Sequence, residues 1–246
     1  LVSRESRTLG SEVVSDILDS LASAHIKLTE GQGAELSWRD SRDRPLQPID
    51  ALKIYALKTA PAFEAAILTG IRLATSHQPY LAPVKQFSRN LGVAFQILND
   101  LDDWQTDRHN KLTAGSDILG GRPTILWALA LECLDAPGQQ LLRTLVADLS
   151  QPAVYRINRV RQLYEDAGVF DRARRLVDKH QQRAEAVAEQ IEPAELRRLF
   201  HYLMDTVLER PSEWSADTEP HGAAAVVEQI ELPWGESGKP APGPPP

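Results

Sequence analysis

The amino-acid sequence predicts an all-α fold. Apolar residues recur at helical spacing along most of the 246 residues, whereas the strict alternation typical of strands is scarce. No repeat of solenoid length is visible. Because a chain of this length buries one sizeable core, we expect one helical domain at residues 1–210, followed by a tail at residues 211–246.

The helices can be placed approximately from the apolar pattern. The segment at residues 49–76 is apolar on nearly all sides, which is typical of a buried helix. Pro61 should bend it, because the proline ring removes a hydrogen bond and clashes with the preceding turn. The expected helices cover residues 11–31, 49–76 and 84–106, and further helices run from near Pro123 to Arg210 after a polar loop at 107–121.

The composition excludes several classes of protein. The net charge of −7 argues against a nucleic-acid-binding surface, for which a basic stripe is expected. A single cysteine, Cys133, is typical of a reducing compartment, so we expect a cytoplasmic location. No apolar run approaches the roughly 18 residues of a membrane span, so we expect no integral membrane segment. Residues 211–246 hold eight prolines and four glycines, and we expect this acidic tail to be disordered.

A stripe of polar and acidic side chains distinguishes the helix at residues 84–106. At about 100° per residue, Gln96, Asn99, Asp100 and Asp103 fall within an arc of about 100°. Carboxylates one turn apart repel each other unless a cation lies between them, and oxygen ligands of this kind are what Mg²⁺ prefers. A Mg²⁺–diphosphate platform and an ordinary amphipathic surface helix both predict this pattern, and periodicity alone does not separate them.

Four short motifs in order resemble those of the trans-isoprenyl diphosphate synthases, the polyprenyl synthetase family of farnesyl and geranylgeranyl type. Phe95-Gln96-x-x-Asn99-Asp100-x-x-Asp103 resembles the second aspartate-rich motif of that family. Gly31-Gln32-x-x-Glu35 and Lys58-Thr59 resemble two earlier motifs, and the loop from Lys111 to Arg122 resembles the one that follows. The resemblance implies the class I isoprenoid synthase fold, a helical bundle around a central cavity.

The same resemblance implies a reaction and a site. The reaction would be a head-to-tail condensation of isopentenyl diphosphate with an allylic diphosphate, with Mg²⁺ as the cofactor. Metal ligands would be Asn99, Asp100 and Asp103. The groups nearest the chemistry would be Lys58, Thr59 and Gln96, and the other substrate-binding residues would be Gln32, Glu35, Phe95, Lys111 and Arg122.

Two departures from the family pattern leave alternatives open. The family's first aspartate-rich motif should precede Gly31 by many tens of residues. Only 30 residues precede Gly31 in this sequence, and they do not contain the motif. We therefore expect the isolated 246 residues not to catalyse condensation, and we expect a homodimer or a partner chain that supplies the missing motif. A non-catalytic or split subunit fits the same observation. The family usually has aspartate at the position of Asn99. Asparagine at this position resembles the metal motif of class I terpene cyclases, so a cyclase is a third possibility. The product chain length is left open.

Overall fold

The structure, a computed structural model, describes residues 2–40, 46–105 and 115–209. Every regular element in these ranges is a helix, which confirms the all-α prediction. The chain divides into two units, Leu1–Leu208 and Glu209–Pro246, and the described helices all belong to the first. Within the described ranges, a search for helices long and apolar enough to span a bilayer finds none.

The N-terminal part is dominated by one long helix. A 3₁₀ turn at Val2–Glu5 and the short α1 at Ser6–Leu9 lead into α2, Ser11–Asp40. The prediction that this helix ends near Gly31 is wrong, because α2 continues for more than two further turns. A glycine in a helix costs only about 1 kcal/mol relative to alanine. Packing of α2 against α3 and α4 is enough to offset that cost.

The expected helix at residues 49–76 is divided in two. The first part, α3, is Pro48–Lys58, and the second, α4, is Ala60–Ala74. They meet at Thr59, whose φ and ψ of −127° and −47° are not helical. Pro61 lies in the first turn of α4, where a missing N–H costs little, so the predicted bend is confirmed and lies just before the proline.

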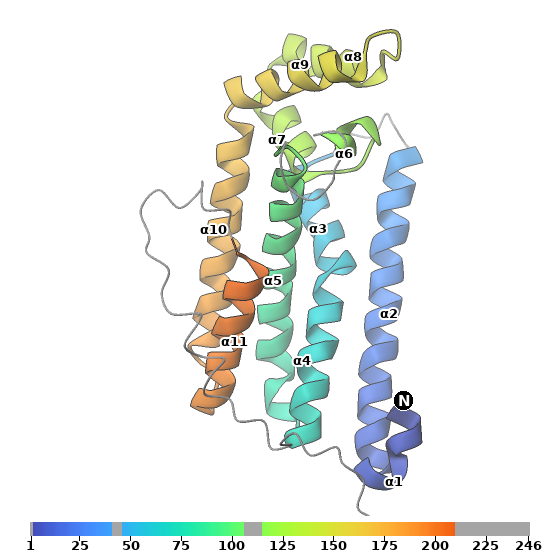
Figure 1. The fold of residues 1–246 in the computed structure, drawn as a ribbon, viewed down its shortest axis with the longest axis vertical. Helices are drawn as coiled ribbons and strands as arrows, with labels where there is room; N and C mark the ends of the chain where they lie inside the picture. The colour runs from blue at the N-terminus through green and yellow to red at the C-terminus, as the bar shows by residue number, and fades with distance from the viewer. Residues whose placement is uncertain (1, 41–45, 106–114, 210–246) are drawn as a thin grey trace, which may run out of the picture. The chain divides into compact units, whose positions relative to one another are not determined.

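The centre of the unit is α5, Leu81–Asp102, which follows a 3₁₀ turn at Gln78–Tyr80. It packs against α3, α4, α7 and α10, and Figure 1 shows it between α4 and α10. Phe87 and Leu91, on the side of the helix opposite the polar stripe, are fully buried, and so are Val93 and Ile97, which lie nearer to the stripe. The interpretation of this segment as an ordinary amphipathic surface helix is therefore wrong.

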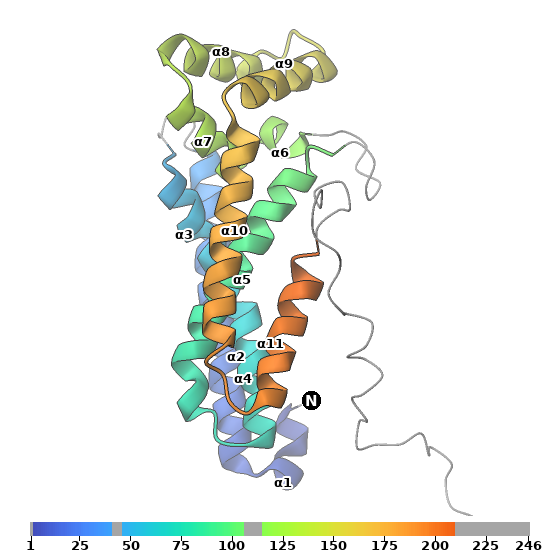
Figure 2. The same cartoon turned by 90° about the vertical axis from the view of Figure 1, so that its left-hand side faces the viewer.

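The remaining helices are α6 Ser116–Leu119, α7 Ile125–Cys133, α8 Ala136–Ala147, α9 Ala153–Asp166, α10 Val169–Ala188 and α11 Ala194–Val207. Helix α7 begins two residues after Pro123, because the Thr124 side chain caps it by accepting a hydrogen bond from the Trp127 amide at 3.2 Å. Helices α8 and α9 pack together and lie across the ends of α5 and α10, as both views show (Figures 1 and 2).

A cavity of about 220 Å³ lies between α2 and α4. Its apolar lining includes Ala24, Pro61 and Ala65, and its polar lining includes Asp16 and Glu64. It begins on the α4 side of the Thr59 bend, and its lining includes none of the residues predicted for the active site.

Candidate active site

The junction of α3 and α4 lies between two glycines of neighbouring helices. A Cβ on Gly31 of α2 would come within 2.7 Å of the Lys58 amide nitrogen. A Cβ on Gly92 of α5 would come within 2.9 Å of the Ala60 amide nitrogen. Both contacts are with backbone, which cannot rotate away, so only glycine allows the helices to approach this closely. The two glycines therefore fix the position of Lys58 and Thr59.

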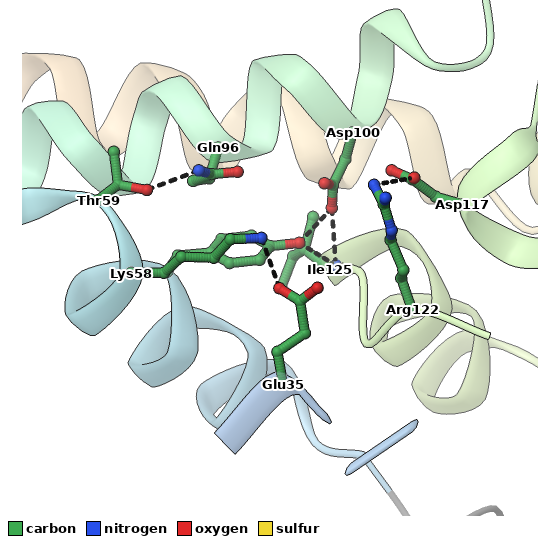
Figure 3. A network of polar contacts seen from close by, with 9 residues as sticks. Glu35, Lys58, Thr59, Gln96, Asp100, Asp117, Arg122 and Ile125 are labelled. Atoms are coloured by element: carbon green, nitrogen blue, oxygen red, sulfur yellow. Dashed lines mark hydrogen bonds and ion pairs between the residues drawn. The ribbon is translucent and has the colours of Figure 1, made fainter. Parts of the chain in front are cut away.

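Two polar pairs lie directly beside this junction. The Lys58 ammonium donates to the Glu35 carboxylate at 2.6 Å, and Glu35 lies one turn beyond Gly31 on α2. The Gln96 side-chain amide donates to the Thr59 hydroxyl at 2.6 Å, and Gln96 lies one turn beyond Gly92 on α5. Figure 3 shows the two pairs side by side, with the Gln96 carbonyl directed toward Asp100.

Asp100 is buried, with 6% of its surface exposed, and its carboxylate is held by two donors. The Tyr55 hydroxyl donates to Oδ2, and the Ile125 amide donates to the same oxygen at 3.0 Å. Burial raises the pKa of Asp100 to about 7, although both hydrogen bonds favour the charged form and lower it. Burial, and then the charge of Asp100, raise the pKa of Tyr55, so its hydroxyl remains protonated and able to donate.

Asp103 lies at the end of α5 with only 1% of its surface exposed. The Ser116 hydroxyl donates to Oδ1 at 2.7 Å, and the Asp117 amide donates to Oδ2 at 3.0 Å. The Asp117 side chain in turn accepts from the Arg122 guanidinium at 2.7 Å. This chain of contacts connects the end of α5 to α6 and orients Arg122 on the side of the site opposite Lys58 (Figure 3).

The structure brings most of the predicted residues together. Glu35, Lys58, Thr59, Gln96, Asp100 and Arg122 form one group (Figure 3). Asn99 is half-buried on α5, next to Asp100. Phe95 packs edge-on against Phe63, with ring centroids 6.2 Å apart, and Gln32 is exposed on α2, so neither joins the polar group. Lys111 lies outside the described residues.

The sequence of this chain matches the model of one protein family, polyprenyl synthetase, over residues 2–165. The chain belongs to the polyprenyl synthetase family.

Named relatives and solved structures agree with this family. The chain is 24% identical over 201 residues to a short chain isoprenyl diphosphate synthase of Methanothermobacter thermautotrophicus, covering 81% of this chain and 60% of that one. A geranylgeranyl diphosphate synthase of Sulfolobus acidocaldarius is 29% identical over 133 residues, covering 54% of this chain and 40% of its own length. This chain thus spans about 60% of the first relative and less of the second.

The fold is also that of known polyprenyl synthetases. A polyprenyl synthetase from Streptomyces coelicolor superposes with a TM-score of 0.73 at 22% identity, covering 82% of this chain and 61% of that one. A geranylgeranyl pyrophosphate synthetase from Pyrococcus horikoshii gives a TM-score of 0.71 at 23% identity, covering 82% and 61%. The prediction of the class I isoprenoid synthase fold is therefore confirmed.

The oxygen donors on α5 fit Mg²⁺ in kind. Mg²⁺ in phosphate-binding sites uses one or two carboxylates, and water and phosphate oxygens complete its octahedron. Both hydrogen bonds described above go to Asp100 Oδ2, so Oδ1 is the second oxygen that Asp100 could offer to a metal ion, and Asn99 is the next residue on α5. In the part of the chain that the structure describes, no three carboxylate, imidazole or thiol groups gather closely enough to form a complete protein cage. If these residues bind Mg²⁺, phosphate oxygens and water would therefore have to supply most of its ligands.

One residue that contacts this polar group was not predicted from the sequence. Tyr55 connects α3 to Asp100 and also accepts a hydrogen bond from the Ile125 amide at 2.8 Å. It lies three residues before Lys58, about one helical turn, and thus on the same side of α3. That spacing alone could have indicated that Tyr55 lies near the site. It does not distinguish a core tyrosine from one that contacts the site, because the partners of Tyr55 come from α5 and α7.

Proposed function

We propose that the chain forms the diphosphate-binding half of a prenyltransferase that joins isopentenyl diphosphate to an allylic diphosphate, head to tail, with Mg²⁺. The chain spans only about 60% of the length of the first relative. The complete condensation reaction is therefore proposed for it, as is the binding of both substrates. The observation that carries it is the placement of Lys58 and Arg122 on either side of the Asp100 carboxylate, with Thr59 and Gln96 on the Lys58 side (Figure 3). Fixed cations facing carboxylate oxygens can bind a diphosphate together with its metal ion.

The proposed chemistry follows from these groups. The bond between C1 of the allylic substrate and its diphosphate oxygen breaks, and pyrophosphate leaves with the electron pair. Lys58 and Arg122 stabilise the negative charge that develops on this leaving group, because their positions are already fixed by Glu35 and Asp117. Asp100, Asn99 and Asp103 would hold Mg²⁺, and the bound ion would neutralise the same charge.

Two polar groups of the chain would stabilise the positive charge left on the allylic carbon. The Gln96 amide donates to Thr59, so its carbonyl oxygen is directed away from that hydrogen bond. The Thr59 hydroxyl and the Gln96 carbonyl are dipoles whose negative ends stabilise a nearby cation. The double bond of isopentenyl diphosphate then forms the new C–C bond, and loss of a proton from the adduct restores a double bond.

Binding is the first test, because it needs only the half of the site described here. Calorimetric titration of the chain with inorganic pyrophosphate should give affinity that rises when Mg²⁺ is added. Lys58→Ala should weaken binding about tenfold to hundredfold, as expected for loss of a charge-assisted hydrogen bond of about 1.5–3 kcal/mol. Lys53→Ala, on the same helix but with a side chain 64% exposed and paired with Asp50, is the matched control and should bind normally. Absence of Mg²⁺-dependent pyrophosphate binding would refute the proposal.

Product analysis is the second test. The protein isolated from its source should convert isopentenyl diphosphate and an allylic diphosphate into a linear diphosphate that is five carbons longer. A cyclic hydrocarbon formed from the allylic substrate alone would identify a cyclase instead. Activity that depends on a second, co-purified prenyl synthase chain would identify a split or regulatory subunit. The cytoplasmic location and the homodimer or partner chain stay predictions, and light scattering of the purified protein tests the latter.

A further inference from the structure

The hydroxyl of Tyr55 lies where three helices meet. Tyr55 is 5% exposed on α3, its hydroxyl donates to Asp100 Oδ2 on α5, and it accepts from the Ile125 amide of α7 at 2.8 Å. The Ile125 amide also reaches Asp100 Oδ2, at 3.0 Å. Each of the three groups therefore contacts both of the others, which makes a closed triangle of hydrogen bonds within the core.

This triangle fixes the direction of the Asp100 carboxylate. Two donors converge on Oδ2, so the carboxylate cannot rotate about its Cβ–Cγ bond without losing both. The direction of Oδ1 is fixed with it, since the two oxygens belong to one rigid carboxylate. The triangle also joins the elements that carry the two cations, because Lys58 lies one turn from Tyr55 on α3 and Arg122 lies three residues before Ile125.

We propose that Tyr55 is a positioning residue that holds the Asp100 carboxylate so that its other oxygen, Oδ1, can bind the Mg²⁺–diphosphate complex. This inference rests on the proposed function. Tyr55 itself touches neither substrate nor metal, and acts by holding Asp100. Groups that orient a metal ligand in this way commonly change metal affinity by about 10–100-fold when they are removed.

The chain contains a matched control for removal of the hydroxyl. Tyr164 on α9 is also fully buried, and its hydroxyl has no hydrogen-bond partner among the described residues. Tyr55→Phe and Tyr164→Phe thus remove the same atom from two buried rings, but only the first removes a hydrogen bond to Asp100. Both variants keep the aromatic ring, so both should fold, and circular dichroism and thermal melting will verify this.

The readout is the affinity for inorganic pyrophosphate with Mg²⁺ and with EDTA. In Tyr55→Phe we expect the Mg²⁺-dependent gain in affinity to fall about 10–100-fold, while the Mg²⁺-free affinity, which depends on Lys58 and Arg122, stays the same. Tyr164→Phe should match the wild type in both. If Tyr55→Phe loses both affinities equally, its role is only structural and the proposal is refuted. It is also refuted if Tyr55→Phe binds like the wild type.

A double-mutant cycle tests whether Tyr55 acts through Asp100. Asp100→Asn should lose the Mg²⁺-dependent gain, and adding Tyr55→Phe should cause no further loss, because the effects of coupled residues do not add. Additive losses would overturn the inference. If the wild-type chain itself shows no Mg²⁺-dependent binding, both the proposed function and this inference fail, whereas a wild type that binds together with an unaffected Tyr55→Phe refutes the inference alone.

Discussion

The contact between Gly31 and the α3–α4 junction makes a quantitative prediction for Gly31→Ala. The new Cβ would lie 2.7 Å from the Lys58 amide nitrogen and 2.8 Å from the Leu57 carbonyl carbon. The nearest contact must lengthen by about 0.7 Å to reach the 3.4 Å at which ordinary contact begins. Because both opposing atoms are backbone, α2 has to move relative to α3, and overpacking of this kind costs about 1–3 kcal/mol.

Gly33→Ala, two residues further along α2, isolates that cost. A Cβ on Gly33 would meet no atom within 4 Å, so this variant should only gain the advantage of alanine over glycine in a helix, about 1 kcal/mol. Gly31→Ala has the same gain, so the difference in free energy of unfolding between the two variants is the overpacking cost alone. Urea denaturation followed by circular dichroism measures it, with an expected difference of about 1–3 kcal/mol in favour of Gly33→Ala.

The same pair of variants also tests the site. Displacement of the Lys58 backbone by about 0.7 Å should weaken Mg²⁺-dependent pyrophosphate binding in Gly31→Ala, because misplacement of this size is costly at binding and catalytic groups. Gly33→Ala should bind normally. If the two variants unfold at the same urea concentration and bind pyrophosphate equally, α2 does not approach the junction in this way, and the argument that Gly31 fixes Lys58 is wrong.

Three further changes have defined outcomes. Thr124→Ala removes the cap that accepts from the Trp127 amide and should lower thermal stability by about 1 kcal/mol; an unchanged melting temperature would contradict the cap. Arg156→Lys should destabilise by about 1–3 kcal/mol, because the buried guanidinium donates to two main-chain carbonyls, whereas Arg159→Lys, exposed on the same helix, should be neutral within about 0.5 kcal/mol in urea denaturation. Burial, and then three neighbouring cations, lower the pKa of His180 to about 4. Below about pH 6.5 the unfolded chain therefore takes up a proton that the folded chain does not, so the free energy of unfolding falls as the pH falls. His180→Gln should reduce that fall by about 1 kcal/mol at pH 5, after allowance for the partial exposure of the ring; an unchanged pH profile would show that His180 does not titrate this way.

The sequence predicted features of single segments better than contacts between segments that are distant in sequence. Helical periodicity located α5 and its polar stripe, and Pro61 predicted the bend between α3 and α4, because both follow from the backbone of one segment. The end of α2 was placed too early, because the helix continues past Gly31, where the missing side chain allows α3 to approach. The partners of Asp100 could not be predicted, because Tyr55 and Ile125 are 45 and 25 residues away in sequence.

The contacts of α5 give a physical reason for the spacing of its polar residues. Gly92, Gln96 and Asp100 are four residues apart, so they lie in one row along the helix. Gly92 approaches the Ala60 backbone, Gln96 binds Thr59, and Asp100 binds Tyr55, so the row meets α4, the junction and α3 in reverse chain order. The row therefore sets the distance between the junction and the acidic end of α5. A change at any of its three positions should therefore alter the site as a whole, and the direct contact between Tyr55 and Asp100 at the end of the row is why their double-mutant cycle should be non-additive.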